Sequence, residues 1–155
     1  MKLTTNKPIQ FQVVADKHRQ TSGDVRLPVR ASSGSMAYDF FANEDFTIMP
    51  HQAKMIWTDV KAIMPGSVGL VINVRSSMGM KGIRLMNTSG WIDSDYANNP
   101  KNDGNIGICL ENDSPFPCVI SSGDRIAQGM FIMYLVTNDD SQCATRTGGF
   151  GSTGT

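Results

Sequence analysis

Residues 68–82 read VGLVINVRSSMGMKG, and this stretch decides the fold. Val68, Leu70, Ile72 and Val74 occupy every second position, so their side chains share one face of a β-strand. The polar run RSS then ends the strand, and residues 76–81 could form one or two helical turns begun by a serine cap. The stretch therefore predicts a buried strand followed by a short, polar, helical segment.

The same period of two recurs along the chain, whereas no ten-residue stretch has the 3.6-residue period of an amphipathic helix. Turn signals rich in Pro, Gly, Asn and Asp separate these stretches, as at residues 65–66 and 112–115. The pattern predicts an all-β sandwich or barrel. The expected strands carry Ile9, Phe11 and Val13; Phe46 and Ile48; Met55 and Trp57; Ile106 and Ile108; and the long apolar run 126–136.

Composition limits the class of protein. The chain has 155 residues, which corresponds to one domain, and its 18% of charged residues and 15 glycines suit a turn-rich β protein. A formal net charge of zero gives no broad basic face, so nucleic-acid binding is not expected. A phosphate ligand stays open if a few arginines converge.

Cysteine and histidine spacing offers no metal site. Cys109, Cys118 and Cys143 are odd in number and lack CxxC spacing, so we expect reduced thiols. His18 and His51 have no metal-ligand spacing and are expected on the surface or in loops. The sequence begins without a signal-like apolar run and contains no membrane-length stretch, so a cytoplasmic protein without membrane contact is expected.

Polar, glycine-bearing segments follow several expected strands, and each allows a functional and a structural interpretation. Asp39 could hold a metal-bound water, position an arginine, or simply cap a turn. Arg75, with Ser76 and Ser77, could bind phosphate or form an ordinary helix start. Gln128 is polar in an apolar strand and needs a partner.

Residues 87–96 are expected to form a hairpin. Asp93 and Asp95 share one face if the strand is regular, while Ser94 faces away. Beside Tyr96, Asp93 could serve as a general base next to a ring-shaped ligand, although a lone hairpin aspartate is more often structural. The tail, residues 146–154, has the ingredients of a phosphate-cradling loop, although its composition alone is typical of disorder.

Five strings, taken in order, resemble the five motifs of the trimeric all-β dUTPase family, of the type found in Gram-positive bacteria and their phages. They are AYD (37–39), VRSS (74–77), GWIDSDY (90–96), GDRIAQ (123–128) and RTGGFGSTG (146–154). The resemblance covers about residues 25–154. It implies a jelly-roll-like distorted barrel with one short helix, formed by residues 1–137. It also implies a homotrimer in which a flexible C-terminal arm, residues 138–155, crosses to another subunit.

The resemblance also implies roles in hydrolysis of dUTP to dUMP and pyrophosphate. Asp93 would activate the attacking water, with Gln128 holding that water or joining the phosphate contacts, and Asp39 would orient a Mg²⁺ shell through waters. Mg²⁺ itself would bind mainly the triphosphate. The phosphate group of residues would be Arg75, Ser76, Ser77, Gln128, Arg146, Ser152 and Thr153. The uracil and deoxyribose group would be Asn87, Gly90, Trp91, Ile92, Asp93, Tyr96, Gly107 and Phe150.

The chain departs from the family pattern at several points. Val74 replaces a proline, and Trp91 is bulkier than expected, so its side chain must lie outside the base pocket. Residues 97–102, ANNPKN, form an insertion that we expect to be a surface loop whose deletion spares hydrolysis. Contact with a regulatory protein partner is one interpretation of this loop. One residue separates Arg146 from the glycine pair, where many family members have two, so its reach along the phosphates is open.

Two other functions compete with dUTP hydrolysis. The first is a dCTP deaminase, or a bifunctional deaminase and dUTPase, which resembles this fold. The second is a regulatory binding protein on a dUTPase scaffold. The complete fifth motif disfavours the deaminase, and the presence of all expected catalytic residues disfavours the binding protein.

Overall fold

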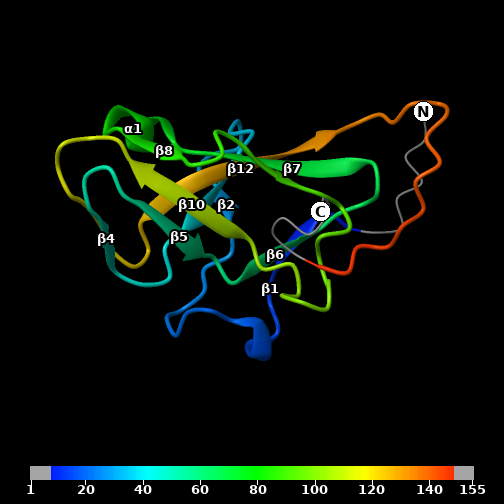
Figure 1. Ribbon diagram of the computed structural model, residues 1–155, viewed down its shortest axis with the longest axis horizontal. Coiled ribbons are helices and arrows are strands. Elements are labelled where there is room, and N and C mark those ends of the chain that lie inside the picture. Colours follow the sequence, from blue (N-terminus) through cyan, green and yellow to red (C-terminus); the bar gives the residue numbers. More distant parts are fainter. Residues whose placement is uncertain (1–7, 149–155) are drawn as a thin grey trace.

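Strand β12 (Arg125–Met133) is the longest strand and organises the fold. It lies at the centre of a five-stranded antiparallel sheet with the order β2-β3-β12-β7-β9. The structure, a computed structural model, describes residues 8–148 (Figure 1). The other members of this sheet are β2 (Val29–Arg30), β3 (Tyr38–Phe41), β7 (Val68–Asn73) and β9 (Gly90–Ile92).

Smaller antiparallel sheets complete the β structure. A three-stranded sheet has the order β5-β10-β8, and two pairs join β1 with β6 and β4 with β11. In Figure 1, β7 and β12 run along the upper part of the molecule, and β5 and β10 cross below them. The bounds are β1 (Gln10–Val13), β4 (Phe46–Ile48), β5 (Ala53–Trp57), β6 (Val60–Ile63), β8 (Ile83–Leu85), β10 (Gly107–Asn112) and β11 (Cys118–Ile120).

The sequence-based fold class is confirmed. Within residues 8–148, the helices are the short α1 (Ser76–Met80) and the single 3₁₀ turn η1 (Asp16–His18), and every other regular element is a strand. The arrangement is consistent with a jelly-roll subunit. No helix in the described part of the chain is both long and apolar enough to cross a membrane.

The core lies between the large sheet and the β5-β10-β8 sheet. Val68, Leu70 and Ile72 are almost fully buried, as their alternation predicted, and they join a cluster that includes Phe40, Ile108, Leu110 and Ile126. Gly129 permits close packing at the centre of β12, because a Cβ there would stand 3.0 Å from both Leu70 and Phe40. Any side chain at that position would force these two neighbours to shift.

Several local expectations are wrong. Arg75, not a serine, is the N-cap of α1, and no side chain caps the helix. In β5, Ile56 faces the core, whereas Met55 is 37% exposed. Strand β12 ends at Met133, so the apolar residues up to Val136 lie beyond it and are exposed.

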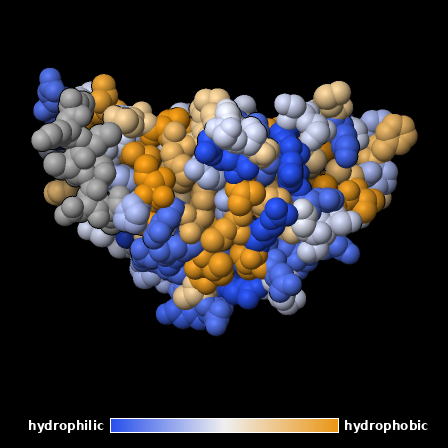
Figure 2. Space-filling model, turned by 180° about the vertical axis from the view of Figure 1, so that it is seen from behind, coloured by the Kyte–Doolittle hydropathy of each residue, from blue (hydrophilic) through white to orange (hydrophobic). Residues whose placement is uncertain are grey.

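Parts of the surface are apolar. Figure 2 shows apolar side chains among charged ones across the face opposite the view of Figure 1. Large apolar residues that are exposed in the single chain include Ile9, Leu27, Val29, Met36, Met55, Trp91, Phe116, Val119, Leu135 and Val136. The three cysteines are free thiols, as expected.

Candidate functional site

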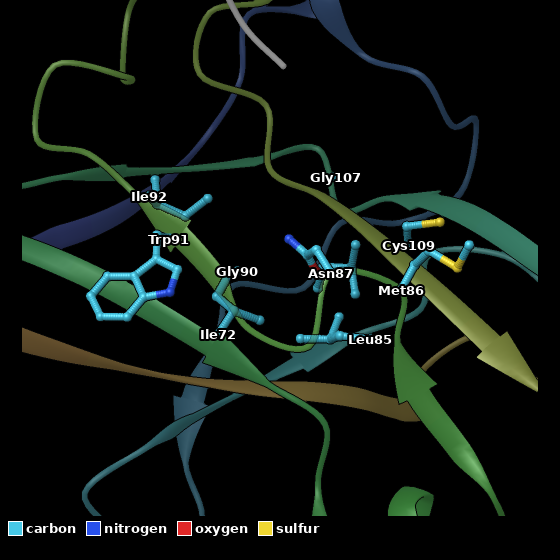
Figure 3. Close-up of a pocket in the computed structure, with 10 residues that line it drawn as sticks. Ile72, Leu85, Met86, Asn87, Gly90, Trp91, Ile92, Gly107 and Cys109 are labelled. Carbon is cyan, nitrogen blue, oxygen red and sulfur yellow. The ribbon is translucent and has the colours of Figure 1, made fainter. Parts of the chain in front are cut away.

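A cavity of about 320 Å³ lies between β9 and the start of β10 (Figure 3). Backbone and apolar side chains make up most of its wall, and Asn87 supplies a polar side chain. A cavity of this size and chemistry suits a flat, partly apolar ring with polar edges. Its lining is Ile72, Leu85, Met86, Asn87, Gly90, Trp91, Ile92, Gly107, Ile108 and Cys109.

The hairpin expected within residues 87–96 does not form, because that segment holds a single strand, β9, and the cavity lies between β9 and β10, which do not pair with each other. Strand β9 pairs with β7, where Ile92 lies opposite Leu70 and Gly90 opposite Ile72. Strand β10 instead pairs with β5 and β8, where Gly107 lies opposite Trp57. The two arms therefore join different sheets, and the space between them stays open. Strand β9 is an edge strand, so one row of its backbone donors and acceptors is not paired with another strand of the described chain.

Trp91 lies at the mouth of this cavity. Its side chain is 68% exposed, and in Figure 3 the indole extends away from Asn87 and Gly107. The Trp91 side chain thus leaves the space between the strands open, which agrees with the expectation that it lies outside the pocket.

Two acidic residues follow β9 and meet one arginine of the C-terminal arm. The guanidinium of Arg146 donates from Nη2 to Asp93 Oδ2 and, at 2.8 Å, from Nε to Asp95 Oδ1. The Asp93 side chain is 64% exposed, so the carboxylate is accessible to water. The arm therefore reaches the predicted general base within a single chain.

Tyr96 is buried beneath this pair. Its hydroxyl donates to the Asn105 carbonyl at 2.8 Å and accepts from Asn102 Nδ2 at 2.8 Å. The Arg146 guanidinium carbon lies 5.8 Å from the centre of the Tyr96 ring, near the outer limit of a cation–π contact. Burial raises the pKa of the phenol above its ordinary value, against the opposing effects of the Asn102 hydrogen bond and Arg146. The Tyr96 side chain is therefore an uncharged phenol that two hydrogen bonds hold in place.

A second polar group forms where β3, β12 and β7 adjoin. Arg75 Nε donates to Asp39 Oδ1 at 2.9 Å, and Arg125 Nη1 lies 3.5 Å from Asp39 Oδ2. Gln128 lies opposite Asp39 on one side and Asn73 on the other. The Asp39 side chain is only 7% exposed, so its carboxylate positions two arginines, which was one of the interpretations left open.

Ser77 belongs to this second group, because its Oγ accepts from Arg75 Nη1 at 3.4 Å. Ser76 and Ser77 are both exposed at the start of α1. Gln128 reaches the Val74 carbonyl at 3.5 Å, which gives the amide a weak partner. Arg125 was not predicted, although it lies inside the string GDRIAQ.

The two polar groups do not meet within one chain. Ile92 pairs with Leu70 in an antiparallel register, so Asp93 lies level with Gly69, six residues before Arg75. At the rise of an extended strand this separation is roughly 20 Å. One chain therefore presents an acid-and-ring half and an arginine half that lie apart from each other.

The insertion is more ordered than a plain surface loop. Asn99 is 4% exposed and Asn105 is fully buried, although Asn98, Pro100 and Lys101 are exposed. A partner contact through the loop stays a prediction. Phe150, Ser152 and Thr153 lie outside the described residues.

The donor set does not suit a magnesium ion held by the protein alone. Among residues 8–148, no three His, Cys, Asp or Glu side chains are grouped so that they could hold a metal. Asp39 already faces two guanidinium groups. Its role toward Mg²⁺ stays a prediction.

Comparison with known proteins points in one direction. The sequence model of the dUTPase family matches residues 24–154. The deoxyuridine 5'-triphosphate nucleotidohydrolase of Lactococcus lactis is 37% identical over 147 residues, which is 93% of this chain and 96% of that protein. The Vaccinia virus protein of the same name is 34% identical over 157 residues, covering 98% and 97%.

Solved structures agree. The dUTPase from Streptococcus mutans superposes with a TM-score of 0.74 at 31% identity, covering 83% of this chain and 98% of that one. A dUTPase from phage phi11 of S. aureus, for which coordination of a structural Mg(II) ion was described, shares the fold at 18% identity. Its TM-score is 0.67, and 87% and 96% of the two chains are covered.

Proposed function

The chain belongs to the dUTPase family, and from this premise we propose that it is a dUTP diphosphatase that hydrolyses dUTP to dUMP and pyrophosphate. The observation that carries the proposal is the cavity between β9 and β10, with Asp93 and Tyr96 directly after its β9 wall. The uracil, the deoxyribose and the attacking water would then all be bound beside one short segment of the chain.

Uracil would be selected by the backbone of the cavity. The free edge of β9 and the Asn87 side chain offer fixed donors and acceptors, which can accept uracil and reject cytosine, because cytosine presents a donor where uracil has an acceptor. Gly90, Trp91, Ile92 and Gly107 would contribute through their main chain. Tyr96 would lie against the deoxyribose and leave no room for a 2′-hydroxyl.

Asp93 would hold the water that attacks the α-phosphorus and accept its proton, while pyrophosphate leaves. The exposed carboxylate meets the geometric requirement for such a base. Its present partner, Arg146, would exchange the carboxylate for the γ-phosphate, since a guanidinium fork binds both anions. Phe150, Ser152 and Thr153 would close over the nucleotide from the same arm and exclude water.

The phosphates would be bound by Arg75, Ser76, Ser77 and Gln128 of another chain. The distance between the two halves in one chain supports this arrangement, because neither half is complete alone. Exposed apolar residues on the single chain also favour an assembly that covers them. A homotrimer satisfies both observations.

The described residues offer no cluster that would hold a magnesium ion alone, so the triphosphate would supply most of its ligands. When bound to the triphosphate, the ion would neutralise its charge. Asp39 would keep Arg75 oriented toward the phosphates.

The test is an assay of pyrophosphate release with dUTP, dCTP, dTTP and UTP, together with an assay of ammonia release from dCTP. We expect pyrophosphate release from dUTP to exceed that from the other three by orders of magnitude. Ammonia production from dCTP at a comparable rate would replace the proposal with a deaminase. No turnover of any of the four would favour a binding protein instead.

A further inference from the structure

The Tyr96 hydroxyl forms hydrogen bonds with one residue of the inserted loop and one residue that follows it. It donates to the Asn105 carbonyl and accepts from Asn102 Nδ2, both at 2.8 Å. A phenol oxygen held by both a donor and an acceptor cannot shift without lengthening one of the two hydrogen bonds. The position of the far end of the Tyr96 ring is thus set by Asn102 and Asn105.

Asn102 is itself locked by its neighbours. Its Oδ1 accepts from Asn99 Nδ2 at 2.6 Å and from the Gly104 amide at 3.1 Å. Asn99 Nδ2 also donates to the Tyr96 carbonyl at 2.7 Å, and its Oδ1 accepts from the amides of Lys101 and Asn102. Two side-chain amides therefore close the loop on itself and on Tyr96.

The loop is fastened to the body of the protein at its base. Lys61 Nζ donates to Asn98 Oδ1 at 2.8 Å and to Asp103 Oδ2 at 2.9 Å, and the Ala15 amide donates to Asp103 Oδ2 at 2.8 Å. Gly104 has a φ of 83°, and a Cβ there would stand 2.6 Å from the Ala97 Cα. This crowding permits one tight path for the chain.

We propose that the insert, residues 97–102, is a positioning element for Tyr96 and that it acts through Asn102. The inference rests on the proposed function, because Tyr96 is the residue proposed to exclude the 2′-hydroxyl of a ribonucleotide. Asn102 contacts no substrate; it fixes the ring that does. The insert thereby sharpens the choice of dUTP over UTP.

The experiment compares Asn102→Ala, Tyr96→Phe and the double variant, with Lys101→Ala as the matched control on the exposed side of the same loop. kcat and KM are measured for dUTP and UTP. We expect Asn102→Ala to lower kcat/KM for dUTP about fivefold, which is the effect of one neutral hydrogen bond. The ratio of kcat/KM for dUTP to kcat/KM for UTP should become smaller. Lys101→Ala should keep the values of the unaltered chain.

When Tyr96 is already replaced by Phe, adding Asn102→Ala should not reduce the dUTP-to-UTP ratio of kcat/KM any further. The same loss in both backgrounds would mean that Asn102 only stabilises the loop, and the inference would be overturned. If Asn102→Ala does not fold, Tyr96→Phe alone decides: an unchanged dUTP-to-UTP ratio overturns the inference.

Ultraviolet titration of the Tyr96 phenol separates this inference from the proposed function. Burial raises the pKa of Tyr96 and the Asn102 hydrogen bond lowers it, so Asn102→Ala should raise the pKa further. The Tyr96→Phe variant identifies the signal. An unaltered chain that does not hydrolyse dUTP refutes the proposed function, whereas an unmoved phenol pKa in Asn102→Ala refutes the contact itself.

Discussion

The insert, residues 97–102, and the described part of the C-terminal arm, residues 138–148, are both polar and free of regular secondary structure. Both lie beside the Asp93–Tyr96 segment, yet they are held very differently. In the insert, the side-chain amides of Asn99 and Asn102 form hydrogen bonds with backbone groups of its own turns and with Tyr96. In the described part of the arm, Arg146 makes the side-chain hydrogen bonds to the rest of the chain, and most other residues are exposed.

Composition does not distinguish these two segments, but hydrogen-bond partners do. A polar loop becomes rigid when its side-chain amides satisfy buried backbone groups, and it stays loosely attached when its polar atoms face water. The insert therefore belongs to the scaffold of the site, whereas the described part of the arm is attached to the site through Arg146.

The largest effect should come from the residue that both segments approach. Asp93→Asn removes the carboxylate while keeping its shape, so turnover of dUTP should fall about a thousandfold with little change in substrate affinity. Single-turnover rates and equilibrium nucleotide binding check the two quantities. A residual rate within tenfold of the unaltered chain would mean that another base acts.

Removal of the arm should have the next largest effect. Truncation after Cys143 deletes Arg146 and the residues proposed to close over the triphosphate, so kcat should fall about a hundredfold. The melting temperature should hardly change, because the arm is mostly exposed. A large loss of thermal stability would show that the arm is part of the scaffold after all.

Deletion of the insert should affect both stability and rate. Joining Tyr96 to Asp103 removes the amides that hold the Tyr96 hydroxyl, so we expect a loss of about 2 kcal/mol in unfolding free energy and roughly tenfold in kcat/KM. Urea unfolding and steady-state kinetics measure them. This reverses the expectation from sequence alone, which treated the loop as dispensable; full activity after deletion would restore that expectation.

The smallest effect should come from the ion pair at the base of the insert. Burial pushes the pKa of Asp103 upward, but the Ala15 amide and Lys61 outweigh it, so the folded pKa lies below the ordinary value. This stabilisation is fully present above about pH 4 and is lost as the pH falls through the folded pKa.

Asp103→Asn should therefore lower the free energy of unfolding by about 1 kcal/mol at neutral pH. The difference in unfolding free energy from the unaltered chain should shrink in acid. Urea unfolding at several pH values measures it. A difference that stays constant down to acid pH would assign the effect to packing instead of charge.

Patterns within a few residues were predictable from sequence. The alternation of residues 68–74 gave β7, and the five motif strings located both polar groups before any pairing was known. Each of these signals depends only on neighbours along the chain, such as the period of apolar positions or the order of the strings.

Contacts between distant segments were not predictable in the same way. The hairpin expected within residues 87–96 is absent because β9 pairs with β7, and only the register of two sheets reveals the cavity left between β9 and β10. Asn102 could not be assigned to Tyr96, since that contact depends on left-handed turns at Asn98 and Asp103. Propensity does not specify such turns for asparagine and aspartate.

The roughly 20 Å between Asp93 and Arg75 has a genetic consequence under the proposed assembly. A chain with a defective acid half and a chain with a defective arginine half would each be inert, but co-assembly would place an intact half of one beside an intact half of the other. Two damaged gene copies could then complement each other. Conversely, a single damaged copy expressed beside a sound one would lower the yield of working sites in every mixed particle that it enters.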